Sequence, residues 1–333
     1  MISRELPPPL RAAIDDLVRA AERPRLEAAA ARLTAAYREG GAARPARTRE
    51  DVLGYAAQRA PATYAAAVAV LSRLHEQRPD WRPRSLLDVG AGPGTASWAA
   101  RAVWPDLERV VLVEAEPEMI ALGRELHLAG PDGRQPEWIG GEFGPISETF
   151  DLVLAAYVLN ELPAERLGAV TRSLWESTED TVVALEPGTP GGYGRILAVR
   201  SEVLDAGGFT LAPCPHDAPC PLLAPDWCHF AVRLQRSDAH RAVKAVSRGF
   251  EDEKFAYVAL AREPQPRPSA RIIRPPQIRS GHVLLDLCEP TGVSRTTVSK
   301  RDRDSYRRAR KAAWGDAFQP ASPSTNIRGA PGV

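Results

Sequence analysis

The chain has 333 residues, of which 44% are hydrophobic and 26% are charged, as is ordinary for a soluble globular protein. No stretch approaches the roughly 20 apolar residues that cross a bilayer, so we expect no membrane association. The first residues show no apolar segment followed by a small-residue cleavage site, which predicts no signal peptide and a cytoplasmic location. Four cysteines in a chain this long exclude a secreted disulfide framework. We expect a monomer.

The charges are distributed unevenly along the chain. Residues 262–333 hold 14 Arg and Lys against 6 Asp and Glu, a net charge of +8, whereas the preceding 261 residues have a net charge of −7. Such an asymmetry indicates a basic face or tail that meets an acidic partner. The alternative is a solvated, arginine-rich surface, since the whole sequence is rich in Ala, Arg and Pro.

Residues 1–80 are predicted to form an N-terminal helical region. Leu10, Ile14 and Leu17 recur at helical spacing and form one apolar stripe. Thr48 and Asp51 have the spacing of a capping box that opens a further helix. Nothing in this region suggests chemistry, so we expect it to cap the domain that follows.

Residues 81–262 are predicted to form a domain in which strands alternate with helices. The segment RSLLDVGAG is a continuous apolar run that ends in glycines, as expected for a parallel strand buried on both faces. The alternation predicts a doubly wound α/β sheet. Prolines and cysteines interrupt it at 212–230, which we interpret as an insertion. Further strands are predicted at 109–115, 150–158, 181–187 and 254–262.

A glycine loop follows the first predicted strand in LLDVGAGPGTASW. Gly90, Gly92 and Gly94 would let the backbone turn tightly and approach a ligand, and Glu114 ends the next strand, where it can bind ribose hydroxyls. Asp88 precedes the glycines and would repel a phosphate, which favours S-adenosylmethionine over a dinucleotide. The pattern resembles the nucleotide site of class I S-adenosylmethionine-dependent methyltransferases, which have a Rossmann-like fold. A site for NAD and a tight turn without a ligand are the alternatives.

The catalytic residues of such an enzyme are less evident. The segment AAYVLNELP lies at the end of the fourth predicted strand, where this fold places groups that face the transferred methyl. Tyr157, Asn160 and Glu161 are therefore candidates to line the pocket. The Asn/Asp-Pro-Pro-aromatic motif of amino-group methyltransferases is missing, and no cysteine stands where a 5-methylcytosine enzyme needs its nucleophile. A protein that binds the cofactor without transferring a methyl group stays possible.

Cys214, Cys220 and Cys228 lie within 15 residues of one another in the insertion, and Cys288 follows far downstream. Their spacing lacks the paired knuckles of most structural zinc sites. Four thiolates without knuckles can hold a zinc ion or an iron–sulfur cluster. Buried, inert cysteines are the alternative. His216 and His229 are expected to support the cysteines rather than to bind a metal.

Residues 263–318 are predicted to form a linker, rich in Pro and Arg up to residue 280, and then a small basic module. Eight Arg and Lys lie between Arg295 and Lys311, with Tyr306 and Trp314 nearby. A basic helix with aromatic residues suits phosphate contacts and base stacking on structured RNA, and a solvated helix is the alternative. In this basic helix, the proposed RNA-binding residues are Arg307, Arg308, Arg310 and Lys311. Residues 319–333 are predicted to be a disordered tail.

Seven segments together resemble one family, the mitochondrial small-ribosomal-subunit assembly methyltransferase-like family, which comprises methyltransferase-like protein 17 and its bacterial relatives. The resemblance runs from about residue 50 to 318, and CPHDAPCPL, WCHF and GFEDEKFAYVAL are its most specific parts. It implies a class I methyltransferase fold that binds the small ribosomal subunit or its rRNA. It also implies a [4Fe–4S] cluster, with zinc as the alternative, on Cys214, Cys220, Cys228 and Cys288.

Three functions are compatible with these motifs and with the family resemblance. The first is an rRNA methyltransferase, which the complete glycine loop favours. The second is a non-catalytic assembly factor of the same fold, which the missing catalytic motif favours. The third is a small-molecule methyltransferase, which the basic C-terminal module and the cysteine segment disfavour.

Overall fold

The computed structural model divides into two compact units. The larger unit comprises Met1–Pro213 and Leu223–Pro266, and the smaller unit comprises Cys214–Leu222 and Arg267–Val333. The predicted insertion, residues 212–230, is thus shared between the two units. Among the residues that the structure describes, no helix combines the length and apolar character that a membrane span requires. The described residues are 2–38, 48–130, 133–235 and 250–319.

Three helices open the larger unit: α1 (Pro8–Ala20), α2 (Arg23–Arg38) and α3 (Arg49–Gln77). The capping box opens α3, because the Thr48 hydroxyl accepts from the Asp51 N–H while the Asp51 carboxylate accepts from the Thr48 N–H, both at 3.2 Å. The side chains of α3 are mostly buried, which explains its Ala-rich sequence. This helix packs against α4 and against strands β7 and β8.

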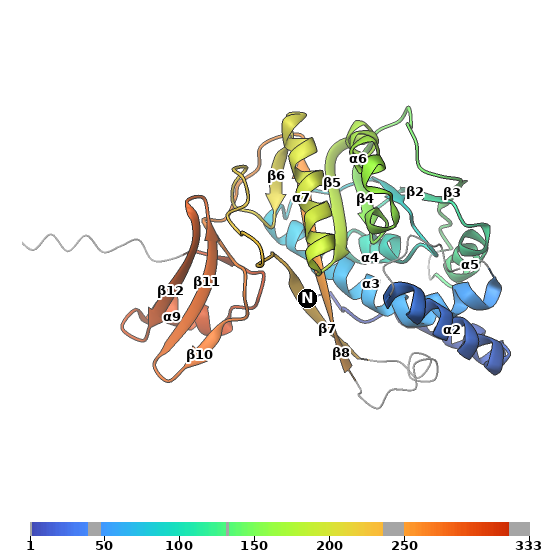
Figure 1. The fold of residues 1–333 in the computed structure, drawn as a ribbon, viewed down its shortest axis with the longest axis horizontal. Coiled ribbons are helices and arrows are strands. Elements are labelled where there is room, and N and C mark those ends of the chain that lie inside the picture. The colour runs from blue at the N-terminus through green and yellow to red at the C-terminus, as the bar shows by residue number, and fades with distance from the viewer. Residues whose placement is uncertain (1, 39–47, 131–132, 236–249, 320–333) are drawn as a thin grey trace, which may run out of the picture. The chain divides into compact units, whose positions relative to one another are not determined.

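An eight-stranded sheet forms the core of the larger unit, with the strand order β3-β2-β1-β4-β5-β8-β6, and β7 pairs with β8 (Figure 1). The first five strands are parallel, and β8 runs antiparallel to β5 and β6. This is the strand order of class I methyltransferases, so the predicted fold class is confirmed. The strands are β1 (Ser85–Val89), β2 (Arg109–Glu114), β3 (Glu137–Gly140), β4 (Phe150–Ala156), β5 (Thr178–Pro187), β6 (Phe209–Ala212), β7 (Phe230–Gln235) and β8 (Phe250–Ala261).

Helices connect the parallel strands. In Figure 1, α6 and α7 lie next to each other over the sheet, and both contact β5. The connections are α4 (Thr95–Val103), α5 (Pro117–Leu128), the short 3-10 helices η1 (Leu159–Glu161) and η2 (Ala164–Arg166), α6 (Leu167–Glu176) and α7 (Pro190–Asp205).

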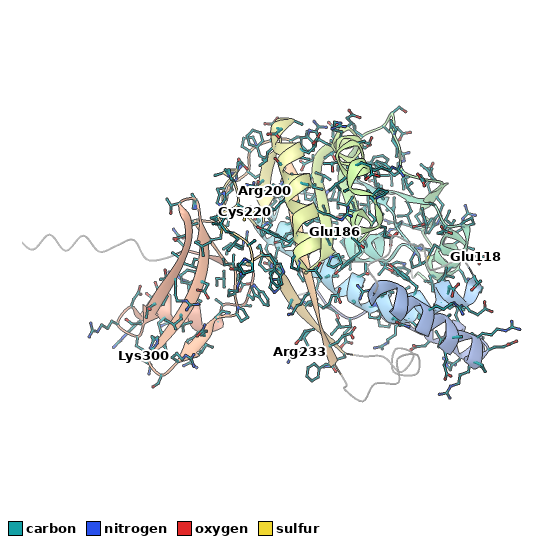
Figure 2. All side chains as sticks on the ribbon, in the orientation of Figure 1. Glu118, Glu186, Arg200, Cys220, Arg233 and Lys300 are labelled. Carbon is teal, nitrogen blue, oxygen red and sulfur yellow. The ribbon has the colours of Figure 1, made fainter. Side chains whose placement is uncertain are left out.

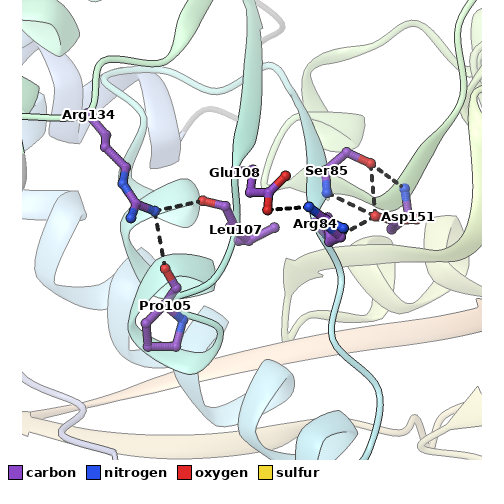
Figure 3. Close-up of polar contacts among 7 residues, drawn as sticks. All are labelled: Arg84, Ser85, Pro105, Leu107, Glu108, Arg134 and Asp151. Atoms are coloured by element: carbon purple, nitrogen blue, oxygen red, sulfur yellow. Dashed lines mark hydrogen bonds and ion pairs between the residues drawn. The ribbon is translucent and has the colours of Figure 1, made fainter.

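One aspartate fixes the amino ends of two central strands (Figure 3). Oδ2 of Asp151, on β4, accepts from the backbone N–H groups of Arg84 and Ser85 at 2.7 and 2.9 Å. The Ser85 hydroxyl in turn accepts from the Asp151 N–H at 2.9 Å. Because β1 and β4 are parallel neighbours, these bonds also fix the relative position of their carboxyl ends, where the glycine loop begins.

The smaller unit contains a five-stranded antiparallel sheet with the order β10-β11-β9-β13, in which β12 also pairs with β11. Alternate residues of β11 point into a core that also includes Ala309 from the helix α9. Residues 263–280, predicted as a linker, thus contribute two strands, and part of the basic segment is a strand rather than a helix. The elements are β9 (Ala270–Ile272), β10 (Gln277–Arg279), β11 (His282–Glu289), β12 (Gly292–Ser299), α9 (Arg303–Lys311) and β13 (Ala317–Phe318). The predicted disordered tail, apart from residue 319, lies outside the described residues.

Candidate functional site

A cavity opens at the carboxyl ends of the parallel strands β1, β2 and β4 in the larger unit. In doubly wound sheets this edge is where ligands bind, because the loops diverge there. The cavity brings together residues that lie far apart in the sequence. Its wall includes Tyr55, Gly90, Gly92, Glu114, Tyr157 and Glu161.

The glycine loop has the conformation that only glycine adopts easily. Gly90, Gly92 and Gly94 have φ angles of 65°, 55° and 82°. A Cβ on Gly90 would lie 2.2 Å from Cγ2 of Val158, so the loop approaches the segment after β4 too closely for a side chain. Gly94 is the N-cap of α4, where a Cβ would lie 2.5 Å from His127, and it is not among the cavity-lining residues.

Both carboxylate oxygens of Glu114 accept hydrogen bonds from backbone amides. Oε2 accepts from the Gly92 N–H at 2.8 Å, and Oε1 accepts from the Glu116 N–H at 2.9 Å. The carboxylate is therefore held at the cavity wall with lone pairs remaining on each oxygen. A ligand with a vicinal diol could bind there without any movement of the side chain.

Asp88 lies on β1 just before the loop, but it does not line the cavity. It is 1% exposed, and neither carboxylate oxygen has a hydrogen-bond partner of normal geometry. Burial raises the pKa of Asp88 to about 8, with a smaller contribution in the same direction from the Glu114 charge. The Asp88 carboxyl group is therefore mainly protonated at pH 7. It does not repel a phosphate by charge, contrary to our prediction from the sequence.

Tyr157 follows β4 directly and has a φ of 61°, the one positive φ of a non-glycine residue in the described ranges. Its hydroxyl donates to Oε1 of Glu253 on β8 at 3.1 Å, and the same oxygen lies 3.1 Å from Nη2 of Arg59 on α3. The Arg59 guanidinium also lies 5.6 Å from the Tyr157 ring centre. Burial and, after it, the Glu253 charge raise the pKa of Tyr157 well above its usual value, so the hydroxyl keeps its proton.

The other two predicted pocket residues differ in position. Glu161 is exposed and lines the cavity. Asn160 is not part of the wall, and its side-chain amide donates to the Tyr157 carbonyl at 2.8 Å. The buried Glu186 on β5, which is labelled in Figure 2, accepts a hydrogen bond from the Leu159 N–H at 2.9 Å. Burial raises the pKa of Glu186 to about 8.

Sequence reasoning missed four residues around the cavity. Tyr55 and Arg59 lie one turn apart on α3, a helix for which we predicted no chemical role. Glu253 belongs to the segment FEDEKF, which was noted only as part of the resemblance. Glu186 directly follows the apolar run at 182–185 of β5, and a carboxylate at the end of such a run was a usable signal.

Cys214, Cys220 and Cys228 are half-buried, and Cys288 is buried. The smaller unit includes Cys214, Cys220 and the buried Cys288, whereas Cys228 belongs to the larger unit. Sγ of Cys288 lies 3.7 Å from Nε2 of the buried His216. In the part of the chain that the structure describes, no group of three or more His, Cys, Asp or Glu side chains could hold a metal ion. Within the smaller unit, the structure thus brings Cys288 and His216 together.

The predicted RNA-binding residues lie on α9 in the smaller unit. Three of them line one groove together with residues that we did not predict, Lys300, Arg303 and Tyr306. The fourth, Arg308, is not among the lining residues and donates from Nη2 to the Ser305 hydroxyl at 3.2 Å. The three predicted residues in the groove are Arg307, Arg310 and Lys311.

The family model described as mitochondrial small ribosomal subunit Rsm22 matches residues 49–319. The chain belongs to the Rsm22 family. The family resemblance noted in the sequence is thereby confirmed, since one relative is the human mitochondrial ribosome assembly protein METTL17, which is 32% identical over 82% of this chain. The Rsm22-cox11 tandem protein 2 of Schizosaccharomyces pombe, also mitochondrial, is 28% identical over 84% of this chain.

This Rsm22-family chain spans 63% of the length of the human relative and 45% of that of the yeast relative. Both relatives are named as mitochondrial proteins, so the prediction of a cytoplasmic protein is wrong. That prediction rested on the lack of a secretory signal pattern, which does not distinguish the cytoplasm from the mitochondrion.

Among solved structures, the Rsm22-family chain is similar to methyltransferases at low identity. The magnesium protoporphyrin IX methyltransferase of Synechocystis, solved with S-adenosylmethionine, is 13% identical, covers 61% of this chain and 80% of its own, and gives a TM-score of 0.41. A methyltransferase from Aquifex aeolicus is also 13% identical, covers 65% and 99% of the two chains, and gives a TM-score of 0.41.

Proposed function

We propose that the larger unit binds S-adenosylmethionine and that the protein acts on the small ribosomal subunit, or its rRNA, during assembly. The main support for the proposal is the cavity, in which the glycine loop, with its positive φ angles, faces the fixed Glu114 carboxylate. The chain also belongs to the Rsm22 family. The name of the human relative, a ribosome assembly protein, supports the second half of the proposal.

The cavity residues fit this cofactor. Because Gly90 and Gly92 have no side chains, the cofactor can approach the backbone of the loop closely. The two Glu114 carboxylate oxygens can accept hydrogen bonds from both ribose hydroxyls. Four carboxylates line the cavity against one guanidinium, that of Arg166, which lies 2.8 Å from Glu142. A negative cavity opposes the phosphates of a dinucleotide and favours a sulfonium cation. When bound, the cofactor would supply an activated methyl group.

Two functions of the protein are compatible with a bound cofactor. In the first, the protein transfers the methyl group to rRNA, and Tyr157 and Glu161 contact the acceptor. In the second, the protein is an assembly factor that binds the cofactor without transfer. The second role is favoured by one observation, because Tyr157 is only 8% exposed and its hydroxyl is already bonded to Glu253.

The four-cysteine metal centre, an iron–sulfur cluster or zinc, is proposed on the resemblance alone. Cysteine thiolates suit either group, although no cluster of three or more His, Cys, Asp or Glu side chains among the described residues could hold a metal ion. We therefore assign no step in the proposed function to a metal.

The test combines binding and transfer. Calorimetry with S-adenosylmethionine should detect one site per chain, and absence of heat with the folded protein would refute the proposal. Small subunits purified from cells that lack the protein should then be incubated with it and with cofactor labelled on the methyl group. Label in the rRNA would establish the first role, whereas saturable cofactor binding with unlabelled rRNA would establish the second.

A further inference from the structure

One groove of the smaller unit is lined by five cationic side chains and one aromatic ring. The lining residues are Lys300, Arg303, Tyr306, Arg307, Arg310 and Lys311. Figure 2 labels Lys300 at the end of β12, and α9 supplies the other five residues. All six belong to the unit that carries the net positive charge of the C-terminal segment.

The cationic residues follow one face of α9. Arg303, Arg307 and Arg310 stand at positions i, i+4 and i+7, which places them on the same side of the helix. With a rise of about 1.5 Å per residue, the stripe is roughly 10 Å long. That length suits two or three consecutive phosphates of one strand.

The opposite face of α9 is held in place by packing and by a cap. Ser305 and Ala309 are buried, and Ala309 belongs to the core of the smaller unit. The Asp302 carboxylate caps the helix by accepting from the Ser305 N–H at 3.1 Å. The cationic stripe therefore extends from a fixed helix, which reduces the entropy lost when it binds a ligand.

Tyr306 has an unusual position for a tyrosine on a charged helix. Its side chain is half-buried and packs against the core of the smaller unit, yet it also lines the groove. The guanidinium of Arg310 lies 5.9 Å from its ring centre. A ring that is fixed on one side and open to the groove on the other is suited to stack on a flat group.

We propose that this groove binds an unpaired RNA strand, with the stripe of cations on consecutive phosphates and one base against Tyr306. This inference rests on the proposed function and specifies the form of RNA that the protein contacts. Unpaired bases can stack on aromatic side chains, whereas a duplex keeps its bases stacked on one another. The aromatic ring among the cations favours this ligand over an acidic peptide, which would use the charges alone.

The groove also separates the basic residues in and just before α9 into two groups. Arg307 lies 3.4 Å from Asp304, but both side chains are more than 70% exposed, so this pair contributes little and can yield to a phosphate. Arg308 bonds to Ser305 and lies outside the groove, as does Arg301. A double variant R301A/R308A is therefore a control that removes positive charge from the same unit without changing the groove.

The experiment measures binding of the full chain to an unstructured 12-nucleotide RNA by fluorescence anisotropy at several KCl concentrations. R307A/R310A/K311A should weaken binding strongly and reduce the slope of log K against log salt by about 2, at about 0.7 per lost phosphate contact. The control R301A/R308A should keep most of the slope. Equal effects of the two variants would overturn the assignment of the groove.

Tyr306 tests the base contact. Y306F should bind like the parent, whereas Y306L, which keeps an apolar side chain against the core, should bind about tenfold more weakly with an unchanged salt slope. The same RNA annealed to its complement should compete poorly. Equal competition by the duplex or by polyglutamate would refute an unpaired strand as the ligand. Calorimetry with S-adenosylmethionine should give the same affinity in the parent and in all variants, which shows that the variants are folded. A parent protein that does not bind the cofactor would count against the proposed function and not against the groove.

Discussion

The hydroxyl of Tyr157 donates a hydrogen bond to Oε1 of Glu253 at 3.1 Å, across 96 residues of sequence. Arg59 approaches the same oxygen from α3, so three separate elements meet at one atom. Tyr157 itself is in the left-handed region, a conformation that costs a tyrosine of order 1–3 kcal/mol. Contacts to Glu253 and to the backbone compensate for this strain and fix the cavity wall behind β4.

Substitutions in this cluster should therefore be coupled. Y157F removes the hydroxyl donor and should lower the free energy of unfolding by about 1 kcal/mol. R59A should cost more, because it leaves the mostly buried Glu253 without its cationic partner. Urea denaturation of the single and double variants forms a double-mutant cycle. Strict additivity would contradict a shared network, since residues in contact show coupling of at least about 0.5 kcal/mol.

The glycine loop should be sensitive to any added side chain. G92V places a branched residue at a φ of 55° in the cavity wall and should abolish binding of S-adenosylmethionine. E114A should weaken binding by removing the proposed ribose acceptor. G194A is the matched control, because a Cβ there meets open space on α7. Calorimetry measures all three, and normal affinity in G92V would exclude this cavity as the cofactor site.

Stability should depend on pH through the buried carboxyl groups. Burial raises the pKa of Glu186 from an unfolded value near 4.5 to about 8, so the folded state retains a proton that the unfolded state releases. Stability should fall as pH rises between these values, by at most about 1.4 kcal/mol per pH unit for each such group. Asp88 acts in the same direction.

E186Q removes one of these two groups and keeps an oxygen for the Leu159 N–H. Its stability relative to the parent should increase from pH 5 to pH 8, as measured by thermal or urea denaturation. E165Q, at an exposed position, should follow the parent at every pH. A stability difference between E186Q and the parent that is the same at pH 5 and at pH 8 would contradict the raised pKa of Glu186.

The metal prediction can be tested without reference to activity. The full chain purified without oxygen should contain iron and sulfide, or one zinc, and C288S should lose the metal because serine is a poor ligand for soft metals. S201A serves as a control for a substitution at another position. A metal-free parent protein would refute the site, and full metal content in C288S would remove Cys288 from its ligands.

Local patterns in the sequence determined most of the elements and the glycine loop. The apolar run before Gly90 is a buried strand, Thr48 and Asp51 form the predicted cap, and the alternation of strands and helices corresponds to a mainly parallel sheet. These features depend on neighbouring residues and on burial of periodic apolar faces, which a sequence records directly. The basic segment was harder to predict, because β12 is rich in Thr, Val and Ser and contains a single Arg, whereas most Arg and Lys of the segment follow it at 300–311.

The tertiary structure alone decided which side chains surround the cavity. Arg59 and Glu253 are 194 residues apart and form one ion pair, and no local pattern could join them. Asp88 was predicted as a charge near the ligand, but complete burial makes it mainly neutral, and only packing determines burial. Arg308 and Arg310 are nearly adjacent in sequence, yet only Arg310 lines the groove, because a helix turns by about 100° per residue and directs the two side chains differently.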